Sequence, residues 1–375
     1  MGRIDQTFYD RIITAHFRAV DNDIVIVAID ERSLSLFGPR PWHRNFHAEL
    51  LRRIAEDQPR AIGLDLMLSD PDMLYPEHDV ELAEVIRNSQ KVVLPMRMEE
   101  RYVDSPTHTR PLSLPYTSTN SLHHNRNDLR TQILPLPLFY EAAAAVGNIH
   151  LDSDFDGIVR SVSLRDRIGS GIWENFAVKM LRVGNDTRVI HNLPPLRPPY
   201  ASYEQTDLEK NMWSTGHAMQ IPFAGPPGKI PRISYADVIN RLVPPDIFHN
   251  KYVLVGITAV GMGGESYPTP VSIGGRAMSS VEVTANIMNA LIQGFTIEPV
   301  TPLANTLFSL LPVAGLLLSL IWLSPRRALL FCLVLIIITI GASYFIVRIG
   351  GYWYPPSAGL LGLVLCATHY GAGNA

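Results

Sequence analysis

The C-terminal part of the chain limits its fold more than any other feature. From Leu303 to Ala375 there is no aspartate, glutamate or lysine, and the only charged side chains are Arg326, Arg327 and Arg348. Helices of this composition have no charged face for water, so they are stable in the hydrocarbon of a lipid bilayer. We therefore expect a water-soluble domain over residues 1–300, followed by an all-α membrane segment.

Three apolar runs in this segment predict three transmembrane helices. Residues 303–323 form an uncharged run of 21 residues, which spans a hydrocarbon core of about 30 Å at a rise of about 1.5 Å per residue. Residues 328–347 follow a short turn that contains a proline and two arginines, which predicts a helical hairpin. A third helix is expected over residues 357–373, after an aromatic group typical of a membrane interface.

The charges beside these runs predict the orientation. The positive-inside rule places Arg326 and Arg327 in the cytoplasm, so residues 1–302 are expected to be extracytoplasmic, on a multi-pass protein of the inner cell membrane. Residues 1–30 contain no signal peptide, and we hypothesise that a leading membrane helix precedes Met1. A cytoplasmic location for the domain stays open as the alternative, because only three arginines decide the topology.

The pattern of apolar residues in the first 300 predicts an α/β fold. Ile24–Ile29 is a continuous apolar run typical of a strand that is buried on both faces. Further strands are expected at residues 61–66, 91–96 and 251–257, and helices at 45–54, 78–88, 136–145, 173–182 and 281–291. Residues 146–151 and 159–165 are expected to pair around a turn, and Ser279 and Glu282 to form a capping box. Together these elements predict a mixed central sheet covered by helices.

Charge and cysteine content exclude several functional classes. Residues 1–302 carry 29 basic and 35 acidic side chains, a formal charge of −6, which argues against a nucleic-acid surface. The two cysteines, Cys332 and Cys366, both lie in apolar runs and cannot form a disulfide framework for the polar domain. No nucleophile elbow, phosphate-binding lysine loop or zinc-protease helix is present, so we expect neither an enzymatic reaction nor a cofactor.

Four polar residues are candidates for ligand binding. Asp30 and Asp65 each follow a predicted strand, and ligands of open α/β sheets gather at the carboxyl ends of strands. His43 and Arg44 directly precede a predicted helix and could bind an anionic ligand at the same edge. The structural alternative is that both aspartates cap turns and pair with Arg44.

A weak candidate for a metal site lies at Asp152, Asp154 and Asp156. Their alternate spacing and the following glycine match the first half of a calcium-binding loop. The second half does not match, because Ser163 stands where a bidentate glutamate is required and Arg160 occupies another ligand position. A β-turn in which the aspartates bind their own backbone is the favoured interpretation, so no metal is expected.

The order of several short motifs carries a resemblance to a known family. These motifs are Phe8-Tyr9-Asp10, Ile24–Asp30, Pro41-Trp42-His43-Arg44, Ala61–Asp65, Gly147, Asp154–Arg160, Lys251–Ala259, Thr269-Pro270 and Val281–Asn286. In this order they resemble the type 2 CHASE domain, the extracellular sensory domain of bacterial cyclases, histidine kinases and Ser/Thr kinases. The resemblance implies about three membrane helices after the sensor and then a cytoplasmic output domain, which we expect to be absent from this chain.

The leading functional hypothesis is therefore a membrane-anchored sensor that binds an unknown extracytoplasmic ligand. The helix at 281–291 would pass a conformational change through Pro299 and Pro302 into the membrane helices. The chain would be a fragment of a cyclase or kinase, or would act on a separate cytoplasmic effector, and a homodimer is compatible with either arrangement. The alternative is an extracytoplasmic hydrolase using Asp30, Asp65 and His43. A transporter is disfavoured because the membrane runs contain no acidic residue.

Overall fold

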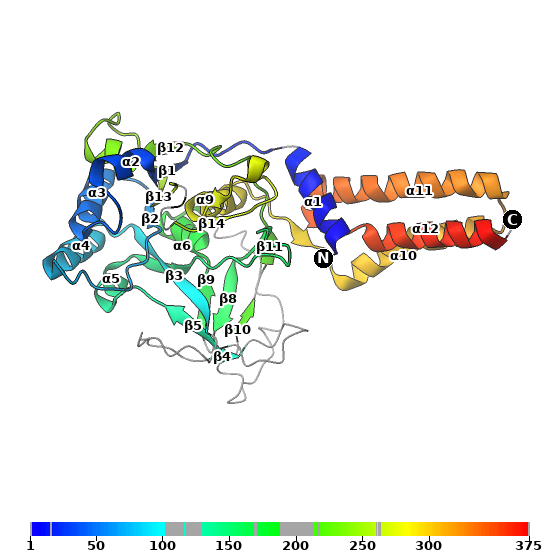
Figure 1. The fold of residues 1–375 in the computed structure, drawn as a ribbon, viewed down its shortest axis with the longest axis horizontal. Helices are drawn as coiled ribbons and strands as arrows, with labels where there is room; N and C mark the ends of the chain where they lie inside the picture. Colours follow the sequence, from blue (N-terminus) through cyan, green and yellow to red (C-terminus); the bar gives the residue numbers. More distant parts are fainter. Residues whose placement is uncertain are drawn as a thin grey trace. The chain divides into compact units, whose positions relative to one another are not determined.

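The computed structural model describes residues 2–15, 17–101, 116–117, 129–168, 171–187, 213–215, 218–259, 261 and 264–373. The chain divides into two compact units, which are coloured along the sequence in Figure 1. The sheet unit comprises residues 18–294. The helical unit combines residues 1–17 with residues 295–375. The chain therefore passes between the two units twice, once at residues 17–18 and once at residues 294–295.

The sheet unit is built on a central mixed sheet of eight strands within the described residues. In order across the sheet these are β12 (Arg232–Ser234), β1 (Ile24–Ile29), β13 (Tyr252–Ile257), β2 (Ala61–Leu64), β3 (Val92–Arg101), β5 (Leu129–Ile133) and β4 (Tyr116–Thr117), with β6 (Ala145–Asn148) also paired to β3. The strands from β12 to β3 are parallel, and β6 is parallel to β3. Strand β5 is antiparallel to the second half of β3. The expected mixed sheet is thus confirmed.

Helices cover both faces of this sheet. One face carries α3 (Arg44–Glu56), α4 (Pro76–Ser89), α5 (Pro137–Ala142) and α8 (Tyr235–Ile239), and α2 (Glu31–Phe37) packs beside α8; the other face carries α6 (Phe176–Val183) and α9 (Ser280–Ile292). Val25 and Val27 of β1 belong to the core that includes Leu50 of α3. On the opposite face Gly256 lies against Val281 of α9. All six residues of β1 are buried, as a strand between two helical layers requires.

Helix α9 is buried along its whole length, so its polar side chains need partners within the protein. The carboxylate of Glu282 accepts hydrogen bonds from the Gly228 N–H (2.7 Å) and from Arg232 (3.1 Å). Ser279 is the N-cap residue of α9, yet its side chain makes no cap hydrogen bond. The predicted capping box is therefore wrong, because Glu282 is held by Gly228, before β12, and by Arg232, the first residue of β12.

Smaller sheets complete the unit. They are β10 (Trp213–Thr215), β8 (Arg165–Ile168) and β9 (Gly171–Glu174) in one sheet, β11 (Ala218–Gln220) with β7 (Ser161–Ser163), and β14 (Ser266–Tyr267) with β15 (Met278–Ser279), next to the 3-10 turn η2 (Ile273–Gly275). The predicted pairing of residues 146–151 with 159–165 is wrong, since β6 pairs with β3 and β7 pairs with β11. The helix expected from residue 173 begins at Phe176, where the Asn175 side chain accepts a cap hydrogen bond from the Ala177 N–H.

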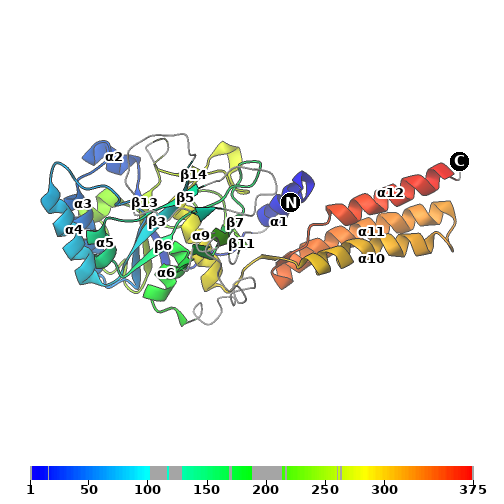
Figure 2. The same ribbon diagram turned by 90° about the horizontal axis from the view of Figure 1, so that it is seen from below.

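Within its described residues the helical unit contains three C-terminal α-helices and one N-terminal α-helix. Its elements are α1 (Arg3–Ala15), β16 (Glu298–Pro299), α10 (Pro302–Ser319), α11 (Pro325–Phe345), the π-helical η3 (Ile346–Gly350), β17 (Tyr352–Trp353) and α12 (Ser357–Gly373). Helix α12 packs along both α10 and α11, and Figure 2 shows the three side by side. Leu316, Cys332 and Leu363 form the core of this bundle, one residue from each helix.

The structure supports two of the three predicted transmembrane helices. Within the described residues, Pro302–Ser319 and Arg326–Gly350 are long and apolar enough to cross a membrane. Helix α12 forms where the third was expected, but its apolar part, Ser357–His369, is shorter than a span. At about 1.5 Å per residue it covers roughly 20 Å of a hydrocarbon core about 30 Å thick. The prediction of three spans is therefore corrected to two candidate spans.

Helix α1, which no expectation had placed, is anchored to the turn before α12. The carboxylate of Asp5 accepts hydrogen bonds from the Ser357 N–H (3.0 Å) and the Ser357 hydroxyl (2.7 Å), and so caps the start of α12. The ring of Tyr9 packs edge-on against Trp353 with the ring centroids 5.0 Å apart. The N-terminal helix is thus an integral part of the helical unit.

We expect Gly147→Ala to destabilise the sheet unit by about 2 kcal/mol, because the added Cβ would lie 2.5 Å from the Cα of Phe176, a backbone atom that cannot move aside. Urea unfolding of the full chain in detergent, followed by tryptophan fluorescence, measures the effect. In the control Gly225→Ala the nearest atom is Cγ of the flexible Lys229 side chain, at 2.8 Å, so a much smaller loss is expected. Equal losses in the two variants would contradict the packing argument.

Candidate functional site

Asp30 is the N-cap residue of α2. Its Oδ1 accepts hydrogen bonds from the Ser33 N–H (2.9 Å), the Ser33 hydroxyl (2.6 Å) and the Ser234 hydroxyl (2.9 Å). The Ser33 hydroxyl also accepts a hydrogen bond from the Ala236 N–H, at the start of α8. Asp30 therefore joins the end of β1 to the β12–α8 connection, and the contacts of its carboxylate are those of a helix cap.

Asp65 directly follows β2 and lies in a different group of polar side chains. Protein packs closely around its carboxyl group, and this desolvation raises the pKa of Asp65 to about 6, although a hydrogen bond with Ser280 acts in the opposite direction. Nearby, Tyr267 donates a hydrogen bond to Glu265 (2.6 Å), and Arg97 forms an ion pair with the same carboxylate. Burial raises the pKa of Tyr267. The charge of Arg97 acts to lower this pKa, and the charge of Asp65 acts to raise it.

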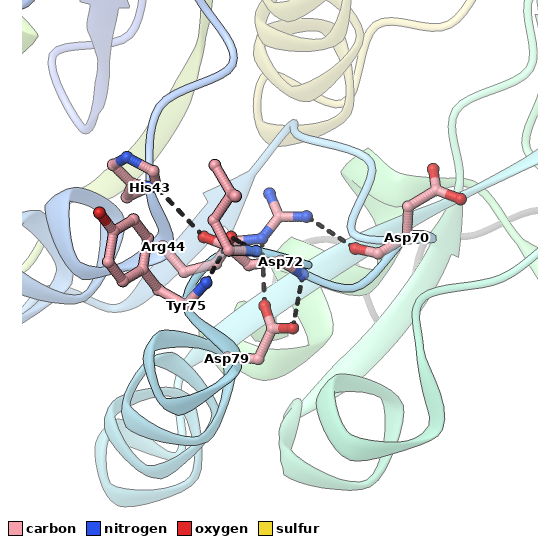
Figure 3. Close-up of polar contacts among 7 residues, drawn as sticks. His43, Arg44, Asp70, Asp72, Tyr75 and Asp79 are labelled. Carbon is pink, nitrogen blue, oxygen red and sulfur yellow. Dashed lines mark hydrogen bonds and ion pairs between the residues drawn. The ribbon is translucent and has the colours of Figure 1, made fainter.

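His43 and Arg44 lie at the start of α3 and face the loop between β2 and α4 (Figure 3). His43 Nδ1 is 3.3 Å from Asp72 Oδ2. Arg44 Nε donates to Asp79 Oδ1 at 3.3 Å, and Arg44 Nη2 donates to the Asp70 carbonyl at 2.9 Å. We call the set His43, Arg44, Asp70, Asp72, His78 and Asp79 the α3–α4 polar cluster.

Asp72 is the residue around which this cluster is organised. Its Oδ1 accepts hydrogen bonds from the backbone N–H groups of Leu74 and Tyr75, both at 3.1 Å, while its own N–H donates to Asp79 Oδ2 at 2.8 Å. Desolvation acts to raise the pKa of Asp72, but the hydrogen bonds from Tyr75 and His43 outweigh it and lower that pKa. The loop and the first turn of α4 thus fix the direction of this carboxylate.

Aromatic rings close one side of the cluster. Tyr75 stacks on His78 with the centroids 5.0 Å apart and meets His43 edge-on at 4.6 Å. Asp72 and His78 were absent from the sequence-based candidates. The available signal was the polar segment that begins with Asp70 soon after a predicted strand, together with a histidine in the first turn of the next helix.

The structure places the four predicted ligand residues in three separate hydrogen-bonded groups. His43 and Arg44 share the α3–α4 polar cluster, Asp30 caps α2, and Asp65 binds Ser280. Arg44 was expected to pair with Asp30 or Asp65, but in the structure it pairs with Asp79. Among the described residues no hydrogen bond or ion pair joins Asp30, Asp65 and His43 to one another, so the hydrolase hypothesis gains no support from their contacts.

The calcium-like loop is occupied by an arginine side chain. Arg160 is 2% exposed, and its Nη1 lies 2.8 Å from Asp154 Oδ2 and 2.9 Å from Asp156 Oδ1, while Nη2 lies 2.8 Å from Asp156 Oδ2. The hydrogen bond from Arg160 is the main cause of the lowered pKa of Asp156. Asp152 pairs with His150 at 2.9 Å. The guanidinium supplies the positive charge that an ion would bring to this loop.

Comparison with known families identifies the chain. Residues 1–335 match the family model of the CHASE2 domain. The chain belongs to the CHASE2 domain family. No curated protein and no solved structure matches it. CHASE2 domains are extracellular sensory domains and not catalytic ones, so membership agrees with the expected sensor module. The α3–α4 polar cluster, Asp65 and the Arg160 loop all belong to this CHASE2 domain.

We expect Arg160→Met to lower the free energy of unfolding by about 3 kcal/mol, because it leaves two carboxylates beside a buried position without their counter-charge. The matched control is Arg32→Met, which removes an exposed ion pair with Asp237 of the same 2.8 Å length and should cost less than about 1 kcal/mol. Urea unfolding of the full chain compares the two. A loss at position 160 no larger than the loss at position 32 would contradict the structural role of Arg160.

Asp65 predicts a pH dependence of stability. A carboxyl with a pKa of about 6 in the folded protein and an ordinary value in the unfolded chain favours folding below pH 4, and this contribution is lost as the pH rises to 6. The loss is about 3 kcal/mol. Burial raises the pKa of Asp166 to about 6 as well, so its own contribution falls over the same range.

Asp65→Asn should therefore be more stable than the wild type at pH 8 and similar to it at pH 4. Urea midpoints measured across this range test the expectation, with Asp70→Asn as the control for the same substitution at an exposed position. An Asp65→Asn profile as steep as that of the wild type would show that Asp65 is not the group responsible.

Proposed function

We propose that this chain is the sensory input module of a membrane-bound bacterial receptor, held in the membrane by α10 and α11. Its membership of the CHASE2 family supports the sensory role. The two candidate spans, which begin at Pro302, soon after the sheet unit ends, support the membrane anchor. The module binds an extracytoplasmic stimulus and passes a conformational change to an output domain. This domain belongs either to the same polypeptide or to a separate effector protein.

The charges between the two spans support the extracytoplasmic position of the sheet unit. Arg326 and Arg327 occupy the first turn of α11, directly after the connection from α10. No acidic side chain lies nearby in the sequence to offset them. On the positive-inside rule this connection is cytoplasmic, so the polypeptide before α10 lies on the other side of the inner membrane.

The transmission route follows from the two chain connections between the units. Within the sheet unit, Asn289 Oδ1 accepts a hydrogen bond from the Asp21 N–H (2.8 Å), and Asn289 Nδ2 donates to the Ala19 carbonyl (3.2 Å). Gln293 Nε2 donates to the same carbonyl at 2.6 Å. The end of α9 is thereby fastened to the segment that leads into β1. This fastening supports the transmission route, because a shift of α9 would move both connections together, while the family membership carries the sensory role.

Of the residues predicted to bind the stimulus, we propose His43 and Arg44 as the ones that contact it or support its site. Both lie near the carboxyl end of β2, where ligands of open α/β sheets bind. The Arg44 guanidinium is engaged by Asp79 and by the Asp70 carbonyl. Arg44 then acts by holding the loop before α4, and His43 offers the more exposed group, with 43% of its side chain accessible.

Reporter fusions in the native gene test the topology. Alkaline phosphatase inserted after the exposed Pro244 should be active, and green fluorescent protein inserted after Ser324 should fluoresce, because each reporter works on one side of the membrane only. Replacing Arg326 and Arg327 by asparagine should weaken both signals, since it removes the charges that set the orientation. Fluorescence at position 244 with inactive phosphatase would place the sensor in the cytoplasm and contradict the proposal.

A further inference from the structure

Three metal-ligating side chains converge in the α3–α4 polar cluster. One ligand atom from each of His43, Asp72 and His78 lies within 4.8 Å of the other two, and all three residues are partly buried. Within the described residues this is the one group of at least three such side chains. The ligands come from the N-cap of α3, the loop after β2 and the first turn of α4. Three separate segments of the fold therefore meet at one point.

Two of these side chains contact each other, through His43 Nδ1 and Asp72 Oδ2, and a metal ion would replace that contact. Asp72 Oδ1 accepts two backbone hydrogen bonds, and its Oδ2 points toward His43. His78 Nδ1 is buried and has no hydrogen-bond partner among the described residues, an unfavourable state for an imidazole nitrogen unless it binds something. Arg44, the nearby cation, is offset by Asp79. Asp72, whose side-chain partner is the imidazole of His43, can therefore supply negative charge to a metal ion.

We propose that His43, Asp72 and His78 form a binding site for a divalent transition metal of the zinc class. Two imidazoles and one carboxylate are a ligand set that suits Zn²⁺, whereas Ca²⁺ and Mg²⁺ prefer oxygen ligands only. Around a tetrahedral zinc at roughly 2.0–2.1 Å, neighbouring ligand atoms lie about 3.3 Å apart. The 3.3 Å between His43 Nδ1 and Asp72 Oδ2 already has this length.

The remaining separations close by side-chain rotation. His43 is 43% exposed at its side chain, so it can turn toward the other two ligands without disturbing the core. Asp72, which is 12% exposed and fixed by the loop backbone, provides the rigid part of the site. Three protein ligands leave a fourth position for water or for an anionic group of a ligand.

The site deepens the proposed function, because it names a class of stimulus for the sensor and rests on that function for its consequence. A bound metal would join the start of α3 to the loop and to α4, and so stabilise this arrangement of the carboxyl edge of the sheet. Metal binding is measured directly on the protein, and membrane topology by reporters. Failure of the one is therefore distinguishable from failure of the other.

Cobalt titration tests the site. The untagged full chain in detergent micelles, stripped with a chelator, should bind one equivalent of Co²⁺ with the visible absorption of a four-coordinate site, and Zn²⁺ should abolish this absorption. His43→Gln, Asp72→Asn and His78→Gln should each weaken binding by at least about tenfold, since even loss of a residue that supports a ligand commonly costs that much. Zn²⁺ should also raise the unfolding midpoint of the wild type and leave that of the variants unchanged.

The control is His150→Gln, in the described pair of His150 with Asp152, which has the same chemistry but no third ligand grouped with it. It should bind Co²⁺ like the wild type. The metal-free unfolding midpoints of all variants show whether each one is folded. Absence of the cobalt absorption in the folded wild type, or an equal loss of binding in His150→Gln, would overturn the proposal.

Discussion

The burial of parallel strands on both faces is the constraint from which the rest of the sheet unit follows. Strand β1 lies between β12 and β13, and its pairing with β13 runs from Ile24–Tyr252 to Ile29–Ile257. Since no position of β1 can be polar, helices must cover the sheet on both sides. Polar side chains are then restricted to the strand ends and the loops that follow them. This restriction explains why Asp30, Asp65 and the α3–α4 polar cluster all lie after a strand.

Elements with strong local patterns were predictable from the sequence, and their pairing was not. The apolar runs of β1 and β13 and the periodicity of α4 and α9 agree with the structure to within a few residues at their ends. Strand β7 instead pairs with β11, more than fifty residues later, and β6 pairs with β3. Such long-range choices depend on tertiary packing, which no local pattern encodes. For the same reason α1 could not be assigned to the helical unit.

The candidate site shows the same division. Position after a strand or before a helix was enough to select His43 and Arg44, but Asp72 and His78 become neighbours of His43 only when the loop after β2 folds back on α3. At Asp154 and Asp156 the sequence pattern instead suggested an ion site where the structure has an internal ion pair. Its carboxylates have the spacing of an ion site, and the buried Arg160 supplies the counter-charge from within the same segment. A set of carboxylates with the spacing of a metal site therefore indicates a metal only when no nearby arginine or lysine neutralises it.

The fastening at the end of α9 links the two segments through which the chain passes between its units, and on the proposed function both would carry the signal. The sequence pointed to a single route, through the prolines at 299 and 302, whereas the assignment of α1 to the helical unit adds a second one, through residues 17–18. Pulling α9 away from the segment at Ala19 and Asp21 would remove the Ala19 carbonyl that accepts from the buried Asn289 Nδ2, at a cost of roughly 1–3 kcal/mol, while Asn289 Oδ1 keeps its hydrogen bond from Gln293. On the proposed sensory function, a stimulus that shifts α9 with less free energy than this would move both segments together without separating them.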